Sequence, residues 1–225
     1  MQFNPEITEL TTAATDAAIA LIAILIVLVL QRRRADYPLK VGLWSLIFGL
    51  LAIGSALGAV VHGFVLPEKV WLGLWQPLYL SLGITVALFV VGAVYDWSGE
   101  RLARRLLLPA VIGGVLFYGM MVVLGGAFLF FVLYEALAMA TALVLYLLVW
   151  ARKTLPGAWL MAAGVGLTMA AAAVQASDLA LTIIWPIDHN GLFHLVQIAA
   201  MLVLAAGLLA GTGEPQRTGS HRPVS

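Results

Sequence analysis

Seven long runs of apolar residues, separated by short polar or helix-breaking segments, dominate the chain. A helix needs roughly 20 predominantly apolar residues to cross the hydrocarbon of a bilayer, and each run is about that long. The pattern predicts an all-α membrane protein built as one seven-transmembrane-helix bundle, residues 1–210. We expect the helices at residues 11–30, 41–65, 70–95, 102–124, 127–150, 157–184 and 190–210.

Positive charges are distributed unevenly between the two sides of this arrangement. With the helices alternating in direction, one side receives eleven of the 12 Lys and Arg residues and the other receives only Lys69. Cytoplasmic loops carry such an excess, so we expect the N-terminus outside and the C-terminus in the cytoplasm of a plasma (inner) membrane. Residues 211–225 are polar and rich in Pro and Gly, which predicts a disordered cytoplasmic tail. The basic inner face suits anionic lipids rather than nucleic acid.

Composition supports the membrane assignment and limits the available chemistry. Hydrophobic residues make up 63% of the chain, charged residues 10%, and the mean hydropathy is +1.03. Soluble globular domains do not have such values. The absence of cysteine excludes disulfides, thiolate metal sites, iron–sulfur clusters and cysteine nucleophiles. A metal would therefore be held by imidazole, carboxylate, amide or water.

Polar residues within the apolar runs gather toward the predicted outer side. His62 lies late in the second run, and His189 and His194 flank the start of the seventh. Asp16 lies in the first run and Asp178 in the sixth. Ionisable side chains at membrane depth are costly and usually mark a functional site. We therefore expect these side chains to surround an outward-opening polar cavity.

Histidines and carboxylates at one depth favour a divalent-metal site, with zinc as the expected cofactor. Three protein ligands with one open position lower the pKa of zinc-bound water to roughly 7. We predict His62, His194 and His189 as metal ligands, and Asp16 and Asp178 as the carboxylates that complete the site or act as base. Ser55, two turns deeper than His62, is a further catalytic candidate. This site predicts a hydrolase whose substrate or ligand is a membrane lipid.

Two other functions remain open from the residues alone. Haem held between His62 and His194 would need two histidines at one depth on facing helices. A non-catalytic receptor or transporter would use the same cavity to bind a lipid or another ligand. Retinal attachment is excluded because the seventh run has no lysine. Glu135, eight residues into the fifth run, is a secondary candidate for the cavity.

Three polar residues have simple structural interpretations. Asp96 and Glu100 lie beside arginines at the predicted inner side, which is typical of ordinary loop charges. Asn190 is a suitable N-cap for the seventh helix.

The chain resembles the superfamily of alkaline ceramidases and progestin/adiponectin receptors in its seven helices, its orientation and its histidines in the second and seventh helices. The resemblance implies a zinc-dependent amide hydrolase, with His62 as the helix 2 ligand and His194 as the second helix 7 ligand. Gly58 stands where that family has a serine, and Asn190 stands where it has its first helix 7 histidine. The chain is also similar to uncharacterised bacterial seven-helix proteins with an Asp in helix 1, an Ala-x-x-His-Gly-Phe-like element (residues 59–64) and a His-Asn start to helix 7, a likeness that implies no activity.

Overall fold

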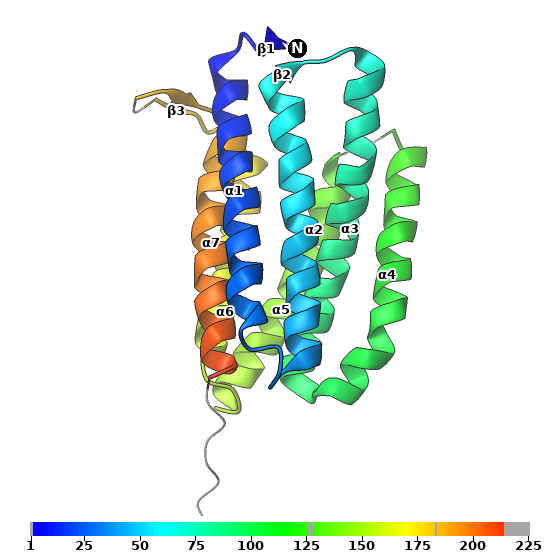
Figure 1. Ribbon diagram of the computed structural model, residues 1–225, viewed down its shortest axis with the longest axis vertical. Coiled ribbons are helices and arrows are strands. Elements are labelled where there is room, and N and C mark those ends of the chain that lie inside the picture. The colour runs from blue at the N-terminus through cyan, green and yellow to red at the C-terminus, as the bar shows by residue number, and fades with distance from the viewer. Residues whose placement is uncertain (1, 126–127, 183, 214–225) are drawn as a thin grey trace, which may run out of the picture.

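The computed structural model describes residues 2–125, 128–182 and 184–213 (Figure 1). Seven helices within these residues are each long and apolar enough to cross a membrane. The prediction of an all-α bundle of seven helices is therefore confirmed, and the helices indicate a multi-pass membrane protein. They are α1 (Ile7–Gln31), α2 (Pro38–Gly63), α3 (Glu68–Ser98), α4 (Glu100–Val123), α5 (Phe128–Ala151), α6 (Ala158–Gln175) and α7 (His189–Gly211).

Two short antiparallel β-ladders lie at one end of the bundle, which we call the N-terminal end (Figure 1). β1 (Gln2–Phe3) pairs with β2 (Phe64–Val65), which ties the chain start to the end of α2. β3 (Leu181–Thr182) pairs with β4 (Pro186–Ile187) between α6 and α7. The opposite end, where α7 finishes, is called the C-terminal end.

Six of the helices form a closed ring. Going round it, α1 packs on α2, α2 on α3, α3 on α5, α5 on α6, α6 on α7, and α7 returns to α1. α4 lies outside the ring, beside α3, at the edge of the bundle (Figure 1). In this order α1 and α7 face α5 and α3 across the centre of the ring.

The α3–α4 contact depends on two glycines. A Cβ at Gly114 would lie 2.8 Å from the backbone of Ile84, and one at Gly83 would lie 3.0 Å from the Gly114 carbonyl oxygen. Small residues allow helix backbones to approach this closely in membranes. Phe117 of α4 stacks on Tyr134 of α5 at 4.0 Å, and the Tyr134 hydroxyl donates to the Gly83 carbonyl at 2.9 Å. α4 is thus attached to the outside of the α3–α5 wall.

The sixth helix is shorter than predicted. α6 ends at Gln175, whereas we expected a helix to residue 184. The Ser177 hydroxyl donates to the Val174 carbonyl at 2.6 Å and accepts from the Leu179 amide at 3.3 Å. Such local side-chain bonds offer the backbone an alternative to helix continuation. Asp178 therefore lies beyond the helix, and its predicted place within the sixth helix is wrong.

The seventh helix also begins differently. Asp188, not Asn190, is the N-cap, because its carboxylate accepts from the Gly191 amide at 2.9 Å. His189 consequently belongs to the first turn of α7 rather than to the preceding loop. α7 ends at Gly211. Residue 127, the predicted start of the fifth helix, and residues 214–225 of the predicted tail lie outside the described residues.

A buried ion pair joins several helices near the C-terminal end. Lys40 Nζ of α2 lies 2.6 Å from Asp96 Oδ1 of α3, and the two side chains are only 3% and 2% exposed. The Tyr146 hydroxyl of α5 donates to the other Asp96 oxygen at 3.2 Å. A Cβ at Gly211 would lie 3.2 Å from Lys40 Nζ, so the amine is also next to the carboxyl end of α7. The interpretation of Asp96 as an ordinary loop charge is therefore wrong.

Breaking this pair from one side should destabilise the bundle more than any exposed charge change. Asp96→Asn leaves the Lys40 amine buried without a counter-charge, a loss that typically costs about 3–5 kcal/mol. We expect a clearly lower thermal unfolding midpoint in detergent. The matched control is Glu100→Gln, because Glu100 pairs with Arg104 on the surface, where a pair contributes about 0–1 kcal/mol. Equal midpoints for Asp96→Asn and Glu100→Gln would contradict this role.

Candidate functional site

The six-helix ring encloses a cavity of about 650 Å³. All six ring helices contribute to its lining, and none of the described lining residues comes from α4. The lining runs from the exposed Asp178 at the N-terminal end to Met139, Met201 and Leu204 in the interior. The cavity therefore reaches the surface at the N-terminal end. Its size lies in the range of small-molecule and cofactor sites.

The residues predicted from the sequence converge on this cavity. Its lining contains all six candidate site residues and the secondary candidate, which come from four of the ring helices and the α6–β3 connection. They are Asp16, Ser55, His62, Glu135, Asp178, His189 and His194. The clustering expected from their shared depth is thus present in the fold, although their chemical roles stay predictions.

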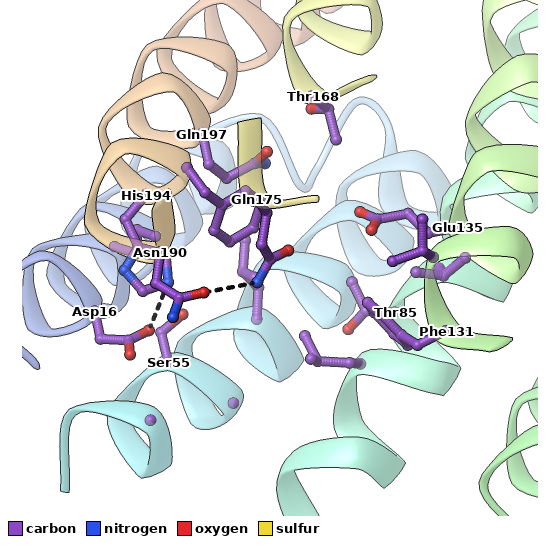
Figure 2. A pocket seen from close by; sticks show the side chains of 18 of the residues that line it. Asp16, Ser55, Thr85, Phe131, Glu135, Thr168, Gln175, Asn190, His194 and Gln197 are labelled. Atoms are coloured by element: carbon purple, nitrogen blue, oxygen red, sulfur yellow. Dashed lines mark hydrogen bonds and ion pairs between the residues drawn. The ribbon is translucent and has the colours of Figure 1, made fainter. Parts of the chain in front are cut away.

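One polar group lies where α1 meets α7. His194 Nδ1 is 2.9 Å from Thr15 Oγ1, and His194 Nε2 is 3.5 Å from Asp16 Oδ1 (Figure 2). Asp16 and His194 are 6% and 7% exposed. Nearby, the Gln175 amide donates to Asn190 Oδ1 at 3.5 Å. These contacts hold the imidazole between a hydroxyl and a carboxylate at the cavity wall.

His62 has a different carboxylate partner. Its Nδ1 donates to Glu9 Oε2 at 2.7 Å, and its ring packs edge-on against Trp75 at 5.9 Å. The sequence analysis did not identify Glu9. A signal for it existed, because Glu9, Thr12 and Asp16 recur at spacings of three and four residues and so share one face of α1. The first turns of α1 therefore supply partners to both histidines.

Two histidines of the predicted zinc site each contact a carboxylate. His62 contacts Glu9 through Nδ1, which does not occupy its Nε2, whereas the two ring nitrogens of His194 lie beside Thr15 and Asp16. Within the part of the chain that the structure describes, no three His, Asp or Glu side chains are grouped to hold a metal ion. Zinc ligation by His62, His189 and His194 thus stays a prediction without a preformed ligand set.

A second polar group lies across the ring, on the wall formed by α3 and α5. Thr85 of α3, together with Phe131 and Glu135 of α5, lines this wall (Figure 2). The Thr85 hydroxyl is buried and has no hydrogen-bond partner among the described residues. The Glu135 carboxylate likewise has no hydrogen bond or ion pair with that part of the chain. Sequence analysis singled out Glu135 but missed Thr85, a lone threonine in a long apolar helix.

Two further cavity-lining side chains hold buried polar atoms without a partner in the described residues. They are the indole nitrogen of Trp75 and the amide oxygen of Gln197. A buried polar group left unpaired costs about 1–3 kcal/mol, and native structures usually supply a partner. Together with Thr85, these atoms place unused hydrogen-bonding capacity around the cavity. A bound molecule or water would satisfy it.

Gly58 creates the space that the Asp16 carboxylate occupies. A Cβ at Gly58 would lie 2.5 Å from Asp16 Oδ2 and 2.9 Å from its Cγ. The carboxylate therefore packs directly on the backbone of α2. This contact also explains why a serine at position 58, as in the ceramidase-like pattern, is incompatible with the observed position of Asp16.

Adding one methyl group at Gly58 should displace the carboxylate. Overpacking of this kind costs about 1–3 kcal/mol, so Gly58→Ala should lower the unfolding midpoint. The matched control is Gly49→Ala on the same helix, where a Cβ would meet nothing within 4 Å. In the Asp16→Ala background the Gly58→Ala effect should largely disappear, as a double-mutant cycle would show. An undiminished effect there would mean that Asp16 is not what the methyl group meets.

Comparison with known proteins assigns the chain to a family without assigning an activity. No curated protein and no solved structure matches it. A family of unknown function, DUF6962, matches residues 11–212, a range that covers nearly the whole bundle. The chain belongs to this family.

Proposed function

We propose that this protein binds a small amphiphilic molecule from the membrane in the cavity of its helix ring. The observation that carries the proposal is a ligand-sized cavity, open at the N-terminal end, whose wall holds buried polar atoms without partners among the described residues. Ligand pockets are typically mainly apolar with a few placed polar groups. This cavity has that composition.

The distribution of the lining supports a ligand with one polar and one apolar part. Asp16, His194 and Asn190 provide charged and hydrogen-bonding groups in the half nearer the N-terminal end. The interior is lined by apolar side chains such as Met201 and Leu204. An amphiphile would place polar atoms beside the first group and its apolar chain against the second. Burial of the chain would supply most of the affinity, at roughly 25 cal/mol per Å² of apolar surface.

A binding function accounts for the site better than the zinc hydrolase that the histidines first predicted. The hydrolase would require its three histidine ligands to converge on one ion, and the described residues contain no group of three His, Asp or Glu side chains placed to hold one. Binding uses the side chains where they lie. The Asp16–His194 pair then serves as a hydrogen-bonding surface for polar atoms of the ligand.

We also propose that the N-terminal end of the bundle faces the outside of the cell membrane. The turns at the C-terminal end carry Arg32, Arg33, Arg34, Arg152 and Lys153. Such a concentration of positive charge favours the cytoplasmic side. The cavity mouth would then open toward the outer leaflet.

The first test is co-purification of a ligand. We expect native mass spectra of the detergent-solubilised protein to contain a bound amphiphile at about one per chain. Ser55→Phe and Thr168→Phe, on opposite walls of the cavity, should each lose it because the new ring fills the space. Leu137→Phe is the control, since Leu137 lies on the outer surface of α5.

The contrary outcomes are distinct. Equal occupancy in the cavity variants and in Leu137→Phe, with all proteins folded by size-exclusion chromatography, would contradict binding in the cavity. Stoichiometric zinc that is lost in both His62→Ala and His194→Ala would restore the hydrolase interpretation.

The orientation can be tested with single cysteines, because the natural chain has none. Thr182→Cys lies in β3 at the N-terminal end, and Ala35→Cys lies between α1 and α2 at the other end. A membrane-impermeant maleimide should label Thr182→Cys on intact cells and Ala35→Cys only after permeabilisation. The reverse pattern would invert the proposed topology. Both substitutions leave the basic residues in place, so the charges that favour the orientation are unchanged.

A further inference from the structure

We infer that the ligand carries a positively charged amine or quaternary ammonium group, and that Glu135 and Thr85 on the α3–α5 wall bind it. This inference rests on the proposed function and names the chemical class of its ligand.

The charge of the cavity lining favours a cation. The lining residues that the structure describes include three carboxylates, from Asp16, Glu135 and Asp178, and no Lys or Arg. The histidines carry charge only when protonated. An anionic head group would therefore meet carboxylates without a permanent counter-charge, whereas a cation would be attracted to them.

Among the three carboxylates, only that of Glu135 is both inside the cavity and without a partner in the part of the chain that the structure describes. Asp16 is paired with His194 at 3.5 Å, and Asp178 is exposed at the mouth, where water solvates it. Glu135 lies half-buried on α5 and makes no hydrogen bond or ion pair with the described residues. A carboxylate held in apolar surroundings needs a counter-charge or a hydrogen-bond donor. A ligand ammonium group would supply both.

Thr85 provides an independent indication on the neighbouring helix, α3. Its side chain is 8% exposed, lines the cavity, and holds a hydroxyl without a partner in the described chain. Figure 2 shows Thr85 beside Glu135, on the other side of the cavity from Asp16 and His194. The Thr85 hydroxyl would accept a hydrogen bond from an N–H of the ligand, or lie against an ammonium methyl group. Two unpaired polar groups thus meet on one wall.

Aromatic rings frame this wall. Phe131 precedes Glu135 by four residues on α5, and Phe89 follows Thr85 by four residues on α3, so each ring shares a helix face with one of the polar groups. Both rings line the cavity. Aromatic faces attract ammonium groups, and enclosed sites of this kind recognise quaternary ammonium ligands. The wall therefore combines one carboxylate, one hydroxyl and aromatic surface, which suits an organic cation better than a hydrated metal ion.

The test compares probes that share a dodecyl chain and differ in head charge. Dodecyltrimethylammonium, dodecanol and dodecanoate are titrated separately into the full-length protein in non-ionic maltoside micelles, and bound probe is counted by native mass spectrometry. The wild type should bind the cation about tenfold more tightly than dodecanol, the gain expected for one charged contact. Tetramethylammonium, which has the head without the chain, should bind at least about tenfold more weakly than dodecyltrimethylammonium.

The variants assign the preference to Glu135. Glu135→Gln should remove the tenfold preference and leave dodecanol binding unchanged, while Glu135→Asp, which keeps the charge, should retain part of it. Glu68→Gln is the matched control, because Glu68 is an exposed carboxylate at the start of α3, outside the cavity lining. It should behave like the wild type.

The failures are distinguishable. Equal binding of dodecanol and the cation in the wild type, tighter binding of dodecanoate, or a preference that survives in Glu135→Gln would overturn the inference alone. Loss of the preference in Glu68→Gln would attribute it to surface charge and would also overturn it. If none of the dodecyl probes binds, the proposed function fails together with the inference. Equal affinity for tetramethylammonium and dodecyltrimethylammonium would overturn the proposal that the ligand is amphiphilic.

Discussion

The contact between α1 and α7 is the interaction on which the rest of the structure depends, because it closes six helices into a ring. Helices with apolar surfaces on all sides gain no hydrophobic energy from association within lipid, so polar contacts and close packing must specify which helices meet. Here Thr12 donates to Asp188 at 3.3 Å, and His194 lies between Thr15 and Asp16. These bonds join the first helix to the last. The same closure creates the cavity and places its polar residues.

The two ends of the bundle use buried charge in different ways. Near the C-terminal end, Lys40, Asp96 and Tyr146 satisfy one another and join α2, α3 and α5. Inside the cavity, Glu135 and Thr85 have no such partners among the described residues. A fully satisfied network stabilises a fold, whereas unpaired polar groups on a cavity wall reduce stability until something binds them. This contrast is the reason that we assign a structural role to the first group and propose a binding role for the second.

The Asp16–Gly58 contact shows how one small residue on α2 determines which side chain lies next to His194 of α7. A histidine in the second helix and another in the seventh resemble the metal-binding pattern of the ceramidase-like superfamily. At position 58, however, the chain has no side chain, and the Asp16 carboxylate fills the space. Asp16 then faces His194, and His62 turns to Glu9. Both histidines therefore lie beside carboxylates that the first helix supplies.

The sequence by itself determined the number of helices, their approximate ends and the depth of each polar residue. The bilayer requires about 20 apolar residues per crossing, so each helix is a long apolar run. Ionisable residues are rare in such runs because their burial in the membrane is costly, so each one is easily located in the sequence. The sequence could not determine which helices are neighbours, since lipid-facing and protein-facing positions are both apolar and helical periodicity is weak. Hence Asp96 was interpreted as an ordinary loop charge, whereas the fold pairs it with Lys40, 56 residues away. The end of α6 at Gln175 and the cap at Asp188 depended on local hydrogen bonds that compete with the apolar pattern. Only the tertiary structure decided that Glu135 and Thr85 share a wall, because the ring order places α3 beside α5 and α4 outside.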